Sequence, residues 1–215
     1  MMTHTRGFAR VVAIGVSTGG PQALSAILPS LPANFPVPIL VVQHMPPVFT
    51  QQLAARLDHE CEVEVKEAAH GDVLHAGVVY IAPGDFHMTI RRNGPHALIV
   101  LDQGAPEHSC RPAVNPMLRS VAHVYGQHVA AFILTGMGSD GRAGCEDVRR
   151  HGGYVVAQSR ASSTVWGMPG AVSEAGLAHR VLPLLDMAGE MIRCTGGTPM
   201  QVPTRHVSCM RRSTA

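Results

Sequence analysis

Short, unbroken apolar runs alternate along this chain with stretches in which apolar residues recur at helical spacing. Strands that are buried on both faces read as continuous apolar runs, as in a parallel sheet covered by helices. The pattern therefore predicts an α/β fold, with a doubly wound, mainly parallel (Rossmann-like) sheet and helices on both faces. The predicted strands of the sheet lie at residues 11–14, 38–43, 129–134, 154–158 and 181–184, and the predicted helices at residues 21–31, 49–57, 115–125, 142–151, 170–175 and 186–194.

Residues 62–101 have a different pattern, because short alternating segments are joined by turn dipeptides such as Pro83-Gly84 and Asn93-Gly94. Such spacing is typical of an antiparallel hairpin or meander. We expect a small antiparallel extension at the edge of the parallel sheet and not a separate domain. Four histidines are expected on its turns and exposed faces, namely His70, His75, His87 and His96.

Length and composition favour one domain, because 215 residues with 46% hydrophobic content can bury one substantial core. We expect this domain to span residues 1–195, followed by a mobile tail over residues 196–215, where Gly, Pro, Thr and Arg follow no period. A net charge of +2 and an aromatic content of 4% give no support for nucleic-acid binding. No signal peptide or membrane span is apparent, so a cytoplasmic location without membrane insertion is expected.

Cysteine and histidine spacing gives no sign of a metal site. The five cysteines are widely spaced and form no C-x-x-C pair, which favours reduced thiols that serve packing. The thirteen histidines follow no metal-ligand pattern. Neither a metal nor a cofactor is expected.

The first predicted strand leads into a tight turn that carries Ser17. The residues Gly15-Val16-Ser17-Thr18-Gly19 fit the G-x-S-x-G nucleophile elbow, and Pro21 suits the first turn of the following helix. A pattern this short is weak, and a packed turn with a serine N-cap explains it equally well. A nucleophile is favoured over a packed turn only if the ends of other strands supply a base and an acid.

His44 and Asp140 provide that chemistry, since each follows a predicted parallel strand as Ser17 does. If the strands are neighbours, all three side chains face one crevice at the carboxyl edge of the sheet. A serine needs a base to accept its proton, and a histidine base needs a carboxylate to orient it. The order Ser, His, Asp differs from that of α/β-hydrolases, so that particular fold is not implied.

Residues 136–141 offer a competing interpretation, because they match G-x-G-x-x-G, follow a strand and precede a helix. Arg160 stands near the position of the usual ribose-binding acid, as in NADP sites. Against a nucleotide site, Asp140 would place a negative charge beside the pyrophosphate. From these residues alone, a triad, a non-catalytic nucleotide-binding module and a purely structural loop stay open.

Five motifs in order resemble the catalytic domain of the chemotaxis protein-glutamate methylesterase (CheB-type) family. The resemblance runs from about residue 9 to residue 194. The motifs are Ile14-Gly15-Val16-Ser17-Thr18-Gly19-Gly20, Gln43-His44-Met45-Pro46-Pro47, Tyr80-Ile81-Ala82-Pro83-Gly84-Asp85, Leu134-Thr135-Gly136-Met137-Gly138-Ser139-Asp140-Gly141 and Gly167-Met168-Pro169.

The resemblance implies a serine hydrolase that removes methyl esters from glutamate side chains and releases methanol, with a related glutamine deamidase activity. The implied partners are methyl-accepting chemotaxis receptors, in their helical cytoplasmic region. By the same resemblance, Ser17 is the nucleophile, His44 the base and Asp140 the orienting acid. Thr18 matches a position that assists the histidine, and Met137 one whose backbone N–H helps to hold the oxyanion.

The chain departs from the family pattern in two respects. The family usually carries a phospho-accepting receiver domain before the catalytic one, and Ser17 lies near the first residue, so we expect a stand-alone unit that is not controlled by aspartyl phosphorylation within this chain. Cys110 stands where a basic residue or histidine is usual, and Asn115 where an acid is usual. These changes leave receptor docking and substrate choice open, and an esterase or deamidase that acts on a non-chemotaxis protein stays an alternative.

Overall fold

A seven-stranded parallel sheet forms the centre of the computed structural model, which describes residues 8–196. The strand order is β3-β4-β2-β1-β7-β8-β9. The predicted doubly wound α/β fold is thereby confirmed. The strands are β1 (Val11–Val16), β2 (Ile39–Gln43), β3 (Glu64–Glu67), β4 (Val78–Ile81), β7 (Val129–Ile133), β8 (Tyr154–Gln158) and β9 (Arg180–Leu182).

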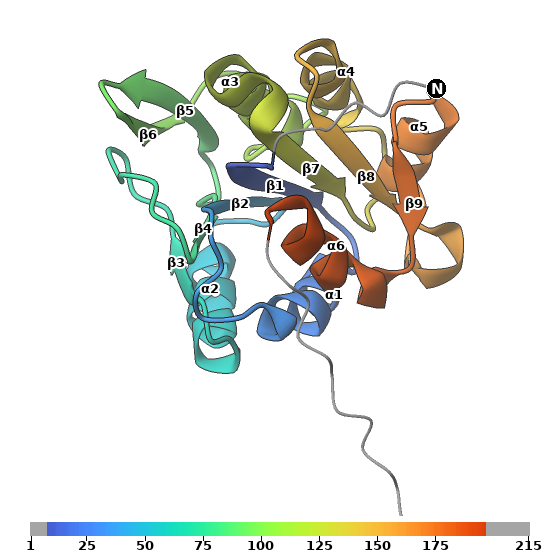
Figure 1. The fold of residues 1–215 in the computed structure, drawn as a ribbon, viewed down its shortest axis with the longest axis horizontal. Helices are drawn as coiled ribbons and strands as arrows, with labels where there is room; N and C mark the ends of the chain where they lie inside the picture. The colour runs from blue at the N-terminus through green and yellow to red at the C-terminus, as the bar shows by residue number, and fades with distance from the viewer. Residues whose placement is uncertain (1–7, 197–215) are drawn as a thin grey trace, which may run out of the picture.

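Helices cover both faces of this sheet, as Figure 1 shows. Successive β1 residues point to opposite faces, so Val12 and Ile14 join one hydrophobic core while Val11 and Ala13 join the other. This double burial explains why β1 reads as an unbroken apolar run. One face carries α1 (Gly20–Ile27), α2 (Phe49–Glu60) and α6 (Met187–Cys194), and the other carries α3 (Val114–Tyr125), α4 (Arg142–Arg150) and α5 (Met168–Glu174).

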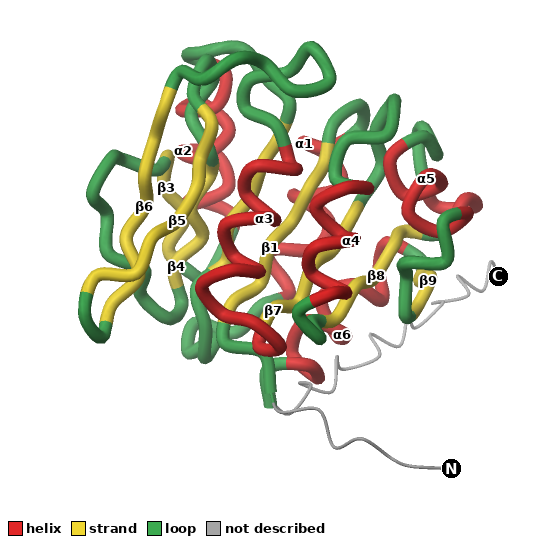
Figure 2. Tube along the Cα trace, turned by 90° about the horizontal axis from the view of Figure 1, so that it is seen from above, coloured by secondary structure: helices red, strands yellow, loops and turns green. Residues whose placement is uncertain are grey.

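The antiparallel part is smaller than the sequence suggested. Among the strands of residues 8–196, only β5 (His87–Asn93) and β6 (His96–Asp102) pair in antiparallel fashion, as a separate two-stranded sheet. This hairpin lies beside α3 (Figure 2), and the Ile90 N–H donates to Ser120 Oγ of that helix at 3.0 Å. The prediction of a meander over residues 62–101 was wrong for β3 and β4, which are parallel strands of the main sheet. Because β3 is an edge strand with Val65 buried and Glu64 exposed, its alternation resembles that of an antiparallel strand.

His87 also differs from its prediction. Its side chain is buried at the start of β5, whereas His70, His75 and His96 are exposed as expected. The loop before α3 folds over His87, whose Nε2 lies 3.0 Å from the Ala105 carbonyl oxygen and whose Nδ1 lies 3.2 Å from the Ala113 N. A histidine with a partner at each ring nitrogen can be buried without an unsatisfied polar atom.

The direction of winding reverses beside β1. The chain passes from β1 to β2 on one side of it and later reaches β7 on the other side. In open α/β sheets, ligands bind at the carboxyl edge where the winding reverses. The loops that follow β1, β2 and β7 are therefore where this fold is expected to carry a ligand site.

Some predictions concern features that the structure describes only in part. Apart from Gly196, the predicted mobile tail lies outside the described residues. Within residues 8–196, no helix combines the length and apolar character that crossing a membrane requires. The four cysteines in the same range, Cys61, Cys110, Cys145 and Cys194, form no disulfide.

Candidate active site

Ser17 lies in the turn between β1 and α1. Its N–H donates to the Thr135 carbonyl oxygen at 3.0 Å, and its own carbonyl oxygen accepts from the Gly20 N–H at 2.8 Å. Gly19 has φ 81, and a Cβ atom there would lie 2.5 Å from Thr164 Oγ1. The turn therefore requires glycine at this position, both for its backbone conformation and for its close contact.

His44 follows β2, directly beside Ser17. The parallel register pairs Val16 with Gln43, and the His44 N–H donates to the Val16 carbonyl oxygen at 3.1 Å. The buried Gln43 side chain holds both loops, because its Nε2 donates to the carbonyl oxygens of Ser17 at 3.1 Å and His44 at 3.0 Å. Sequence reasoning missed Gln43, although a polar residue at the end of an apolar strand was a signal for it.

Gly136 brings the loop after β7 against Ser17 from the other side. A Cβ atom on Gly136 would lie 2.8 Å from Ser17 Cβ and 2.5 Å from Met168 Sδ. The Gly136 carbonyl oxygen accepts from the N–H groups of Gly167 at 3.0 Å and Met168 at 2.8 Å. The Gly-Met-Pro motif at the start of α5 thus supports the loop that carries Asp140.

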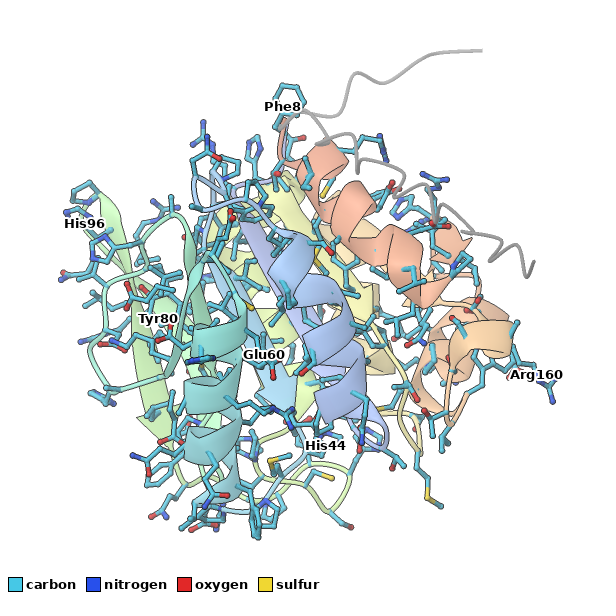
Figure 3. The ribbon with its side chains drawn as sticks, turned by 90° about the horizontal axis from the view of Figure 1, so that it is seen from below. Phe8, His44, Glu60, Tyr80, His96 and Arg160 are labelled. Carbon is cyan, nitrogen blue, oxygen red and sulfur yellow. The ribbon has the colours of Figure 1, made fainter. Side chains whose placement is uncertain are left out.

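Asp140 pairs with His44, since His44 Nε2 lies 2.8 Å from Asp140 Oδ2. The His44 side chain is 11% exposed and that of Asp140 is 2% exposed. The carboxylate also accepts three backbone N–H groups: Val114 at 2.6 Å, Asn115 at 3.1 Å and Gly141 at 2.8 Å. Figure 3 shows His44 in the lower half of the molecule, well away from Phe8 at the top.

These contacts decide the ionisation of Asp140. Burial acts to raise its pKa, but the hydrogen bonds from His44 and from the Val114 N–H outweigh this effect, and the pKa of Asp140 is lowered from its ordinary value. The carboxylate is therefore an anion at neutral pH. Such an anion stabilises the positive charge that a histidine base acquires when it takes a proton.

In the described part of the chain, the side chains of the remaining predicted residues, Ser17, Thr18 and Met137, form no hydrogen bond with this pair. Within residues 8–196, no hydrogen bond joins Ser17 Oγ to His44, or Thr18 Oγ1 to His44. In unliganded enzymes, catalytic hydrogen bonds are often long and tighten only with substrate bound. Met137 is 75% exposed, and in this same range the backbone N–H groups of Met137 and Thr18 have no protein acceptor.

The geometry argues against a nucleotide at residues 136–141. The N–H groups at the start of α4 already have acceptors, since Gly141 donates to Asp140 Oδ1 and to Asn115 Oδ1, and Gly144 donates to Asn115 Oδ1. A dinucleotide site needs the N–H groups at the start of this helix free for the pyrophosphate. The glycines here serve close packing instead, because a Cβ atom at Gly144 would lie 2.5 Å from Leu118 Cβ.

The chain is thus an α/β protein whose parallel strands bring a serine, a histidine and an aspartate to one edge of the sheet. Comparison with known proteins agrees with this description. The family model described as CheB methylesterase matches residues 12–191. The chain belongs to the CheB methylesterase family.

Relatives and a solved structure show how close this likeness is. A protein-glutamate methylesterase/protein-glutamine glutaminase of Trichodesmium erythraeum is 53% identical over 86% of this chain and 53% of its own length. One from Nocardioides sp. is 51% identical over 89% of this chain and 52% of its own length. The crystal structure of the Thermotoga maritima CheB methylesterase catalytic domain superposes with a TM-score of 0.85 at 45% identity, covering 86% of this chain and 98% of that one. The chain spans about half the length of the curated relatives it matches.

Proposed function

We propose that this protein hydrolyses the methyl esters of glutamate side chains on chemotaxis receptors and deamidates receptor glutamines by the same route. The observation that carries the proposal is the His44–Asp140 pair, held at 2.8 Å beside the turn that bears Ser17. The names of its relatives join these two activities, methylesterase and glutaminase. Both are acyl transfers to water that differ only in the leaving group.

In the proposed reaction, Ser17 Oγ attacks the ester carbonyl carbon while His44 takes the serine proton. Because Nε2 of His44 faces Asp140, the nitrogen that is left for this proton is Nδ1. His44 then gives this proton to the leaving-group oxygen as its bond to the acyl carbon breaks, which releases methanol, or to the leaving nitrogen of a glutamine substrate, which releases ammonia. Water, activated by His44, releases glutamate from the acyl-enzyme and restores Ser17.

The oxyanion requires N–H donors that are not already used by the protein. Among the described residues, the backbone N–H groups of Met137 and Thr18 have no protein acceptor and are candidates for this role. We assign the Met137 N–H to the oxyanion and keep Thr18 as the residue that assists His44. The exposed Met137 side chain would then lie against the substrate segment.

The proposed partner is the helical cytoplasmic region of a methyl-accepting receptor, which places the reaction in the cytoplasm. No metal or cofactor takes part in the proposed steps. Within the described residues, no group of three or more His, Cys, Asp or Glu side chains has an arrangement that could hold a metal ion.

A labelling experiment and a substrate experiment together test the proposal. A fluorophosphonate probe should label the wild type and the Ser30→Ala control, in which an exposed serine is removed, but not Ser17→Ala. Mass spectrometry of a methylated receptor peptide should then show loss of methyl groups with the wild type and with Ser30→Ala, but not with Ser17→Ala. Methanol release that persists in Ser17→Ala would refute the mechanism. A labelled Ser17 with an unchanged receptor peptide would instead indicate an esterase that acts on another protein.

A further inference from the structure

Helices α3 and α4 exchange caps next to the candidate site. Their own N-cap residues, Ala113 and Gly141, offer no side-chain acceptor to the first turn. Asp140 lies just before α4, yet its carboxylate accepts from the first N–H groups of α3, those of Val114 and Asn115. In return, Asn115 Oδ1 accepts from the Gly141 and Gly144 N–H groups at the start of α4, at 3.0 Å and 2.8 Å.

This exchange fixes Asp140 from two directions. The orphan N–H groups of a helix start are strong donors for an anion, so α3 holds the carboxylate directly. Asn115 holds the backbone on its other side, because the loop cannot leave α3 while Gly141 and Gly144 are bound to the Asn115 amide oxygen. Asn115 is 2% exposed, so water does not replace these bonds easily.

We propose that Asn115 is a positioning residue for the reaction, which sets the orientation of Asp140 and, as a neutral amide, adds no second negative charge beside that aspartate. The proposal rests on the function proposed above. Asn115 touches no reacting atom and acts only through Asp140 and the start of α4.

The neutrality of Asn115 matters because a carboxylate at the same position would also serve as the acceptor. In Asn115→Asp, the new carboxylate oxygens would accept the same two N–H groups, but this second carboxylate would lie beside Asp140. Two adjacent negative charges favour the protonated imidazole, and a protonated His44 cannot accept the serine proton. Replacing the amide by a carboxylate should therefore move the acid limb of the activity profile to higher pH.

Other ionisable groups near Asp140 do not account for a shift of the acid limb. Burial raises the pKa of Cys110 and of Cys145, and the hydrogen bond to Glu107 raises the pKa of Arg119, so these groups keep one charge state between pH 5 and 8. His87 faces the Ala113 N–H at the same helix start. His87 is retained in every variant compared, so it does not account for a difference between their profiles.

The test measures the rate of fluorophosphonate labelling of Ser17 against pH, with thermal unfolding recorded in parallel. Asn115→Asp should fold like the wild type and shift the acid limb up by about one pH unit. Asn115→Ala should label about tenfold more slowly even at pH 8, because the loop of Asp140 loses its anchor. Asn34→Asp adds the same charge at an exposed loop before β2 and should leave the profile unchanged.

Each result separates the possibilities. If Asn115→Asp gives the wild-type profile, or if folded Asn115→Ala labels at the wild-type rate, the positioning role is overturned. A lower unfolding temperature with unchanged labelling at every pH identifies a purely structural residue and also overturns it. Failure of the wild type itself to react would refute the proposed function instead.

Discussion

His44 presents Nε2, and not Nδ1, to Asp140 Oδ2, at 2.8 Å. In the serine protease template the aspartate binds Nδ1 and the serine faces Nε2. In the mechanism proposed above, the two ring nitrogens exchange these roles: a proton on Nε2 points at the carboxylate, and Nδ1 serves as the base. The exchange is possible because Ser17 and His44 leave neighbouring parallel strands in register, while Asp140 reaches the ring from the loop after β7.

Asp140→Asn should lower kcat by about 10⁴-fold, as the same replacement of a triad aspartate does in the serine protease template. The amide can no longer stabilise the charged ring, and it allows the proton to sit on Nδ1, where it blocks the serine. Methanol release from a methylated receptor peptide measures the effect. Asp186→Asn, which neutralises an exposed aspartate before α6, is the matched control and should retain full activity. Equal activity of the two variants would contradict the role of Asp140.

Asp140 should also make stability depend on pH in the acid range. Its folded-state pKa is lowered, because hydrogen bonds from His44 and Val114 outweigh the effect of burial. Its contribution is therefore fully present above the unfolded-state pKa of about 4 and is lost as pH falls through the lower folded-state value. Urea unfolding of the wild type and Asp140→Asn between pH 6 and pH 2 measures this contribution. As pH falls, the free energy of unfolding should decrease more for the wild type than for the variant. A difference between the two that stays constant with pH would contradict this role of Asp140.

Gly136→Ala should impair activity and stability together. The new methyl group would lie 2.8 Å from Ser17 Cβ and 2.5 Å from Met168 Sδ, so the serine turn must shift. We expect a cost of about 1–3 kcal/mol in the free energy of unfolding and a loss of Ser17 labelling of tenfold or more. Gly189→Ala in α6 is the matched control, since nothing lies within 4 Å of its Cβ position. The control should gain about 0.5–1 kcal/mol from helix propensity and keep full labelling.

Glu190→Gln should separate stability from activity. Glu190 is buried on α6 and accepts from Tyr154 Oη at 2.5 Å, from Arg180 Nη1 at 2.8 Å and from Arg193 Nε at 2.8 Å. Loss of the charge should cost about 1–3 kcal/mol, a modest value because both guanidinium groups are about half exposed. Urea unfolding measures this cost, with the exposed Glu174→Gln as the control. Ser17 labelling of the folded variant should be unchanged, and slower labelling would mean that this cluster supports the site.

The sequence by itself determined the elements that depend on local pattern. The apolar run that begins at Val11 predicted a strand buried on both faces, and the small residues after it predicted a tight turn, and the structure confirms both. The same local reasoning located the strand ends that carry Ser17, His44 and Asp140, while their assigned roles came from the family resemblance and await the experiments above. Where the pattern was ambiguous, as in the edge strand β3, alternation alone could not distinguish parallel from antiparallel pairing.

Only the tertiary structure decided which groups hold those side chains. The hydrogen bond from Gln43 to Ser17 and those from the α3 start to Asp140 join residues that are 25 or 26 positions apart in the chain. The Asn115 amide oxygen also makes a contact between distant parts of the chain. It caps α4, which begins at Arg142, 27 residues after Asn115 (142 − 115). Propensity and periodicity describe near neighbours, whereas these contacts arise only when the strands are placed side by side in the sheet. That physical difference explains why the turn at Ser17 was predictable and the residues that orient His44 and Asp140 were not.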